Sequence, residues 1–283
     1  MVRQPTRMVV LDFSGTLSLS ATEYGRAEHL LRKLEESGLC RFGLDSVERF
    51  WTEVVNPTWQ EGSTTAKGYR QLLFEQLSRL SSSRSEKVSK AEIEACAARF
   101  VDGYFQHSTI APQWRVVIED IVREADALAV VASDHYAEAT SHILRQLEVL
   151  GLEGVPALRA LSPGQVLVAN SADLGHPKAS RQFWERLQRA QGIGALQVIG
   201  IVDDFGFNEQ PEDAYAAAEK VRARQEQLMA VLASVFSAPV RVFPFRLEVG
   251  AVGDPLRTEA YLRLIEQARR FVRQVLAENR GPE

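Results

Sequence analysis

The sequence predicts an α/β protein built on a doubly wound parallel sheet, with an inserted segment that is all helical. Two observations support this fold class. Short β-rich apolar runs alternate with helical stretches, a pattern typical of a parallel sheet covered by helices on both faces. The long segment between the first two runs contains amphipathic helical patterns and no convincing strand. At 283 residues the chain is long for one domain, so a core with an inserted module is expected.

Five apolar runs mark the predicted strands. The first, at residues 8–11 (MVVL), ends directly at the sequence DFSGT. Each run is bounded by Pro, Gly, Ser or Asp, the residues that commonly end strands. The later runs are ALAVVAS at 127–133, QVLVAN at 165–170, LQVIGIV at 196–202 and VRVF at 240–243.

Three amphipathic stripes predict helices between the first two strands. The first stripe stops at Ser37-Gly38, where glycine favours a helix C-cap. The Ser-rich stretch 81–89 is interpreted as a connection between the other two helices. The stripes are Ala27, Leu30, Leu31 and Leu34; Tyr69, Leu72, Leu73, Leu77 and Leu80; and Ile93, Cys96, Ala97, Phe100 and Tyr104. A further helix is expected at 256–279, with charged residues at solvated-face spacing.

Composition excludes several classes of function. The net charge of −4 and the pI near 5.9 argue against a nucleic-acid-binding surface, which needs concentrated Lys and Arg. Cys40 and Cys96 lie far apart without a metal-binding spacing, so neither a disulfide framework nor a zinc site is expected. The apolar run near the N-terminus is too short for a signal or membrane segment. We therefore expect a cytoplasmic protein with a small-molecule substrate and no membrane or nucleic-acid partner.

Polar residues end several of the apolar runs, and these positions predict the functional site. Asp12, Ser133 and the pair Asp203-Asp204 follow three predicted strands. In an open parallel sheet ligands bind at the carboxyl ends of the strands, so these side chains should converge on one crevice. Lys178 lies shortly before the last of these strands. Paired carboxylates can hold Mg²⁺, a metal and a lysine can neutralise a phosphoryl group, and a carboxylate can attack phosphorus.

The turn after the first strand fits the same chemistry. Gly15 and Thr16 are expected to let backbone amides approach an anion, and Ser133 is expected to add a hydrogen-bond donor. The predicted substrate-binding residues are therefore Gly15, Thr16, Ser133 and Lys178.

Four segments in this order resemble the ordered motifs of the haloacid dehalogenase superfamily: VVLDFSGTL, VVASD, SADLGHPK and VIGIVDD. The resemblance implies a Rossmann-like catalytic core formed by residues 1–16 and 113–283, with residues 17–112 as a helical cap domain. It also implies a Mg²⁺-dependent hydrolase or phosphotransferase that acts on a small phosphorylated or phosphonylated metabolite through an aspartyl intermediate.

The resemblance assigns roles to individual residues. Asp12 corresponds to the nucleophile, Ser133 to the phosphate ligand of the second motif and Lys178 to the lysine of the third. The implied metal site consists of Asp12, the backbone carbonyl of Ser14, Asp203 and Asp204. The implied catalytic set is Asp12, Ser14, Ser133 and Lys178.

The first motif departs from the family pattern at Ser14. The family usually has a second aspartate there, which protonates the leaving group and activates water. A serine hydroxyl is a poor general acid or base, and losing such a group costs on the order of 10²–10⁴ in rate. The departure keeps open a second hypothesis, a catalytically weak relative that serves as a binding or regulatory protein.

Phosphonate hydrolysis also stays open, because some relatives lack this aspartate and use a cap lysine instead. Lys33 and Lys67 are the candidates for that lysine. Dehalogenation ranks third, because the acidic pair indicates a metal that dehalogenases do not need. Several cap side chains could contact substrate, although aromatic residues at helical spacing favour core packing: these are Trp59, Tyr69, Arg70, Tyr104 and His107.

Overall fold

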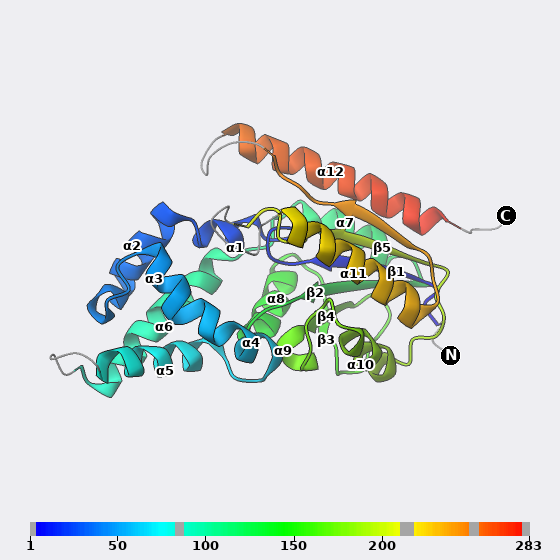
Figure 1. The fold of residues 1–283 in the computed structure, drawn as a ribbon. Helices are drawn as coiled ribbons and strands as arrows, with labels where there is room; N and C mark the ends of the chain where they lie inside the picture. Colours follow the sequence, from blue (N-terminus) through cyan, green and yellow to red (C-terminus); the bar gives the residue numbers. More distant parts are fainter. Residues whose placement is uncertain (1–3, 83–87, 210–217, 249–254, 279–283) are drawn as a thin grey trace.

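Six parallel strands form one sheet in the order β3-β4-β2-β1-β5-β6 (Figure 1). The computed structural model describes residues 4–82, 88–209, 218–248 and 255–278. Every neighbouring pair of these strands is parallel, so the predicted doubly wound α/β fold is confirmed. The strands are β1 (Arg7–Asp12), β2 (Ala127–Ser133), β3 (Gly154–Pro156), β4 (Val166–Asn170), β5 (Val198–Asp203) and β6 (Val240–Pro244).

Alternation along the buried strands divides the core into two layers. In β1, Val9 and Leu11 belong to one hydrophobic cluster, whereas Met8 and Val10 belong to the other. Successive side chains of a strand point to opposite faces, so a strand that is apolar at every position is buried on both sides. The runs that predicted β1, β2, β4 and β5 are continuous for this reason.

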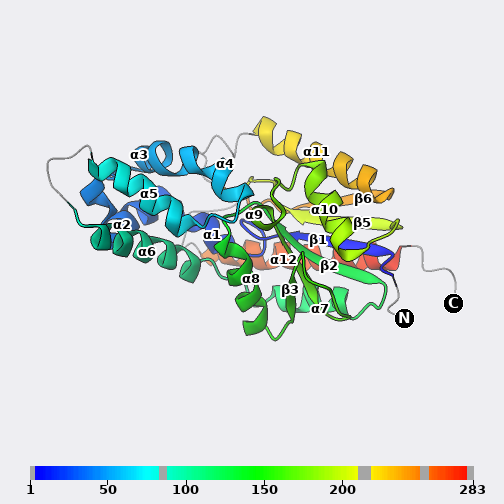
Figure 2. The same cartoon turned by 90° about the horizontal axis from the view of Figure 1, so that it is seen from below.

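Helices cover both faces of the sheet. Helices α7 (Trp114–Val122), α8 (Glu138–Val149) and α12 (Pro255–Ala277) pack on the face of Val9 and Leu11. Helices α10 (Arg181–Gln191) and α11 (Ala218–Phe236) pack on the other face and lie together there in Figure 2. The short helix α9 (Ser171–Leu174) follows β4 directly. No helix in the described ranges is long and apolar enough to cross a membrane.

A helical segment fills the chain between β1 and α7, and the described residues of this stretch contain no strand. Figure 1 shows it at one end of the sheet. Its division from the core at residues 16/17 and 112/113 stays a prediction. The elements are α1 (Leu19–Tyr24), α2 (Ala27–Ser37), the 3₁₀ helix η1 (Leu39–Phe42), α3 (Val47–Phe50), the π-helix η2 (Trp51–Val55), α4 (Asn56–Thr64), α5 (Tyr69–Ser82) and α6 (Lys90–His107).

Local signals explain where several of these helices begin and end. Gly38 ends α2 with a left-handed φ of +84°, as the Ser37-Gly38 sequence predicts. Ser89 and Glu92 form a capping box at the start of α6. Residues 83–87 of the predicted Ser-rich connection lie outside the described residues.

The start of α5 is held by the core. The Glu138 carboxylate of α8 accepts the backbone N–H groups of Tyr69 at 2.7 Å and of Arg70 at 3.1 Å. The Tyr69 ring stacks on Tyr136, with centroids 4.1 Å apart and planes 3° from parallel. A negative charge at a helix N-terminus satisfies free N–H groups and complements the helix dipole. These contacts tie the helical segment to the loop after β2.

Strand β3 was not predicted from the sequence. This edge strand has three residues, ends in proline and is half-buried along its length. Such a segment has neither the length nor the apolar run by which a strand is recognised.

Candidate active site

The carboxyl ends of β1, β2 and β5 meet at one point of the sheet. Asp12 ends β1, Ser133 ends β2 and Asp203 ends β5. The chain passes from β1 to β2 on one side and returns to β5 on the other, which is the switch point where doubly wound sheets bind ligands. Asp12, Asp203 and Asp204 are each at most 6% exposed. The structure therefore brings together the strand-end residues that the sequence singles out.

Asp12, Asp203 and Asp204 form an acidic cluster. One carboxylate oxygen from each lies within 4.8 Å of the others. Burial raises the pKa of Asp12 well above its usual range; Lys178 opposes this shift, whereas Asp203 and Asp204 add to it. Burial also raises the pKa of Asp204 to about 8, with Asp203 contributing through its charge. Three buried carboxylates around one point suit a hard divalent cation such as Mg²⁺.

Lys178 joins two of these carboxylates. Its Nζ donates to Asp12 Oδ1 at 2.5 Å and to Asp203 Oδ2 at 2.8 Å. Its backbone N–H donates to Asp134 Oδ1 at 2.6 Å, which fixes the loop that carries it. Burial alone would lower the pKa of Lys178, but the surrounding carboxylates, chiefly Asp12 and Asp203, raise it well above its usual range. The surrounding carboxylates therefore stabilise the charged form of the lysine beside Asp12.

The turn after β1 holds Asp204 in place. Gly15 has a φ of +78°, and a Cβ at this position would lie 2.5 Å from Asp204 Oδ2. Thr16 Oγ1 accepts the backbone N–H of Asp204 at 3.1 Å, and Asn208 Nδ2 donates to the Gly15 carbonyl at 2.7 Å. Neither Gly15 nor Thr16 is among the described residues that line the cavity above the site. Their role as substrate ligands stays a prediction, whereas their contacts position Asp204.

Glu209 is a site residue that sequence reasoning missed. Ser14 Oγ donates to Glu209 Oε1 at 3.3 Å, and both residues line the cavity. Glu209 follows Asp204 in the loop after β5, where no periodic pattern directs attention to it. The only available signal was an acid a few residues beyond a predicted metal-binding pair. The structure thus brings a carboxylate to the side chain that stands where the family usually has an aspartate.

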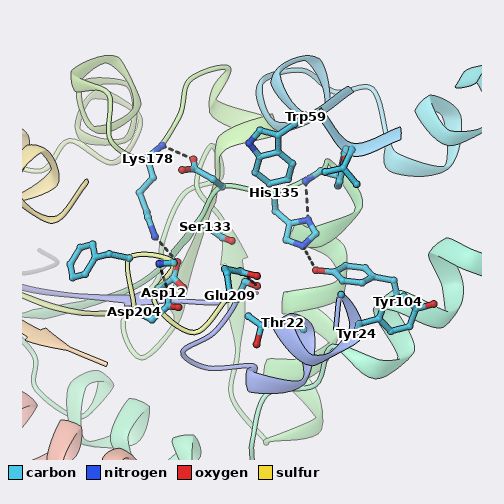
Figure 3. Close-up of a pocket in the computed structure, with 18 of the residues that line it drawn as sticks. Asp12, Thr22, Tyr24, Trp59, Tyr104, Ser133, His135, Lys178, Asp204 and Glu209 are labelled. Atoms are coloured by element: carbon cyan, nitrogen blue, oxygen red, sulfur yellow. Dashed lines mark hydrogen bonds and ion pairs between the residues drawn. The ribbon is translucent and has the colours of Figure 1, made fainter. Parts of the chain in front are cut away.

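A cavity of about 410 Å³ covers these residues. Its lining includes Asp12, Ser14, Ser133, Lys178 and the Asp203-Asp204 pair, and Figure 3 shows several of them around one space. The volume lies within the range of small-molecule sites. The helical segment supplies the opposite wall.

The predicted cap candidates divide into two groups. Trp59, Tyr69 and Tyr104 line the cavity, although their spacing favoured core packing. Arg70 instead pairs with Asp102 at the surface at 2.5 Å, and the His107 ring lies 4.7 Å from that of His29. Helical periodicity indicates a face that avoids water, and such a face packs equally well against another helix or around a ligand.

The two candidate Schiff-base lysines form ion pairs elsewhere. Lys33 Nζ lies 2.6 Å from Glu36, and Lys67 Nζ lies 2.6 Å from Glu75 and 3.1 Å from Glu61. Neither lysine belongs to the described lining of the cavity. This arrangement gives no support to a phosphonate hydrolase that uses either residue.

Comparisons with known proteins return similarities in structure only. Neither a scan of family models nor a search of curated proteins gives a match. A 2-haloacid dehalogenase from Pseudomonas syringae pv. Tomato DC3000 aligns with a TM-score of 0.46 and 17% identity, over 77% of this chain and 99% of that chain. YfnB from Bacillus subtilis, assigned to the HAD-hydrolases and bound to magnesium, aligns with a TM-score of 0.41 and 12% identity, over 78% of this chain and 84% of that chain. The fold class rests on the strand order, and the candidate site rests on its own geometry.

Proposed function

We propose that the protein is a Mg²⁺-dependent hydrolase or phosphotransferase of the haloacid dehalogenase type, acting on a small phosphate monoester. One observation carries the proposal: Lys178 bridges Asp12 and Asp203 in the lining of the cavity, beside Asp204. A structural salt bridge needs one carboxylate. Burying two carboxylates against one lysine, with a third beside them, is costly unless they serve a cation or a reaction.

In the proposed reaction the Asp12 carboxylate attacks phosphorus. The bond between phosphorus and the ester oxygen breaks, and the departing oxygen takes a proton. Water then attacks the aspartyl-phosphate, which releases phosphate and restores Asp12. Lys178 and the Ser133 hydroxyl bind the phosphoryl oxygens, and the helical segment excludes bulk water.

The metal site would consist of Asp12, Asp203, Asp204 and the backbone carbonyl of Ser14. The bound Mg²⁺ would neutralise negative charge on the phosphoryl group. The donor set supports this ion, because three buried carboxylates lie within 4.8 Å. Lys178 compensates part of their charge.

Glu209 is the proposed proton carrier. It lies next to Ser14, where the family pattern would have the second aspartate of the first motif. In its protonated form Glu209 would donate a proton to the departing oxygen. The resulting carboxylate would later accept a proton from the attacking water, directly or through the Ser14 hydroxyl. The alternative hypothesis, a catalytically weak binding or regulatory protein, depended on the missing acid at residue 14. A second carboxylate at that place weakens this alternative.

A direct test is turnover of a panel of phosphate monoesters by the purified protein with and without Mg²⁺. We expect phosphate release that requires Mg²⁺. Mg²⁺ binding without turnover of any member of the panel would favour the binding or regulatory alternative. Equal turnover in the presence of a chelator would contradict the metal-dependent mechanism.

Replacing Glu209 tests the proton carrier. We expect Glu209→Gln to lower kcat by roughly 10²-fold, because general acid–base catalysis contributes about 10²–10⁴ in rate. The loss should be smaller for a nitrophenyl ester, whose leaving group needs little protonation. Glu226→Gln, an exposed glutamate on α11, is the matched control and should retain turnover.

A second substitution tests whether a carboxylate at residue 14 can replace the one at Glu209. Ser14→Asp in the native background should bring little gain, because two carboxylates would then repel each other. In the Glu209→Gln background the same substitution should recover part of the lost rate. Unchanged kcat in Glu209→Gln, or no recovery in the double variant, would remove Glu209 from the mechanism.

A further inference from the structure

The cavity has two chemically different ends. Its charged lining residues come from the strand-end loops and from α11, and they include Asp12, Lys178 and Glu209. The described lining residues from the helical segment carry no charge at all. Figure 3 shows this division, with Asp12, Asp204 and Lys178 gathered apart from Tyr24 and Tyr104. With Mg²⁺ bound as proposed, a ligand that fills the space would place an anionic group at the charged end and an uncharged group at the other.

Aromatic rings form much of the uncharged end. They include Tyr24, Phe50, Trp59, Tyr69, Phe100 and Tyr104. Their mutual contacts hold them in fixed orientations: Trp59 meets Tyr136 edge-on at 5.4 Å, and Tyr24 meets Tyr104 edge-on at 5.4 Å. Rings held in this way give flat, apolar walls, which match a planar apolar group and pair with it by edge-to-face or offset contact.

One hydrogen-bond donor at this end has a defined direction. The backbone N–H of Tyr136 donates to His135 Nδ1 at 2.8 Å, so this nitrogen carries no proton. Burial lowers the pKa of His135 to about 3, so the ring is neutral and its proton lies on Nε2. His135 Nε2–H therefore donates to Tyr104 Oη at 2.8 Å.

Because His135 donates to it, the Tyr104 hydroxyl can give its own proton to an acceptor in the cavity that it lines. The Tyr24 hydroxyl is different, because it donates to the Phe100 carbonyl at 3.2 Å. Tyr104 thus adds a directed donor to a wall that is mainly aromatic and that also includes Thr22 and Asn56.

We infer that the site selects phosphate monoesters whose organic part is an uncharged aromatic group, with one acceptor oxygen able to meet Tyr104. This inference rests on the proposed function for the phosphate end and on the cavity lining for the other. Sugar phosphates fit less well, because several of their hydroxyls would lose water against these rings.

Binding of unreactive phosphonates tests the selectivity without requiring catalysis. The probes are phenylphosphonate and methylphosphonate, measured by calorimetry with Mg²⁺ present, with glucose 6-phosphate as the hydroxylated comparison. We expect phenylphosphonate to bind at least ~10-fold more tightly than methylphosphonate, since even small apolar groups in a pocket contribute 10-fold or more. Glucose 6-phosphate should bind no better than methylphosphonate.

Two variants identify the wall responsible. Trp59→Leu should reduce the affinity for phenylphosphonate several-fold and leave that for methylphosphonate unchanged. Phe74→Leu is the matched control, because Phe74 is half-buried on α5 but is not among the described cavity residues. Tyr104→Phe should weaken at least one of the 2-, 3- and 4-methoxyphenylphosphonates and leave phenylphosphonate unaffected.

The outcomes separate this inference from the proposed function. Selective binding of phenylphosphonate without turnover of any ester would support the aromatic subsite and contradict the hydrolase. Turnover with equal or better use of sugar phosphates would support the hydrolase and overturn the subsite. Equal binding of phenylphosphonate and methylphosphonate would overturn the subsite in either case.

Discussion

Replacing Asp12 by asparagine is expected to lower kcat/KM by at least ~10³-fold with the fold retained. An amide has nearly the shape of the carboxylate but cannot attack phosphorus. Asp12 Oδ1 also lies 2.5 Å from Lys178 Nζ. The substitution therefore removes a buried ion pair as well. Steady-state kinetics with a phosphate monoester measure the loss, and circular dichroism checks the fold.

Asp173→Asn is the matched control for this experiment. Asp173 is a half-buried aspartate close to β4, and it accepts a hydrogen bond from Thr140 at 2.6 Å. It does not belong to the described lining of the cavity, so its variant should retain activity. If Asp12→Asn kept more than a few per cent of the native rate, direct attack by water or another site would have to replace the aspartyl mechanism.

The second large effect is expected on metal affinity. Replacing both Asp203 and Asp204 by asparagine should weaken Mg²⁺ binding by about 10²-fold or more, because Mg²⁺ is held mainly by charged oxygen ligands. Calorimetric titration of the metal measures this directly and needs no substrate. Asp173→Asn again serves as control. An unchanged Mg²⁺ affinity in the double variant would show that this cluster is not the metal site.

The same double variant relieves repulsion between carboxylates but also loses hydrogen bonds that these carboxylates accept. Asp204 Oδ1 accepts the N–H of Gly206 at 3.1 Å, and its Oδ2 accepts the N–H of Asn208 at 2.8 Å. An asparagine side chain offers one acceptor oxygen, so one N–H would face an amide NH₂ group. At residue 203 the amide could likewise accept from only one of the two present donors, Lys178 Nζ and the Phe205 N–H. We therefore expect little or no gain in the stability of the metal-free protein, although repulsion alone would predict one.

Sequence patterns predicted the central strands and the residues that end them. Strands buried on both faces must be apolar throughout, and a polar residue directly after such a run marks the edge of the sheet where ligands bind. Asp12 and Asp203 were found for this reason. Strand β3 was not predicted, because an edge strand of three residues needs no apolar run.

The rest of the site depends on contacts that no local pattern encodes. Glu209 reaches Ser14 from a loop that is distant in sequence, so only the folded chain brings the two together. The stripe that includes Tyr69 correctly predicted a helix with one buried face. The spacing could not show that Tyr69 borders a cavity, because an apolar helix face can pack against another helix or line a binding site with the same periodicity.

Glu138 and Tyr136 fix the position of the cavity wall that contains Tyr69. Both residues follow β2, and both hold the first turn of α5, one through two backbone N–H groups and the other through a ring stack. The two hydrogen bonds and the ring stack all involve Tyr69 or Arg70, in the first turn of α5. Moving the first turn of α5 away from the core would therefore cost all three contacts at once, which holds this wall of the cavity in the position described.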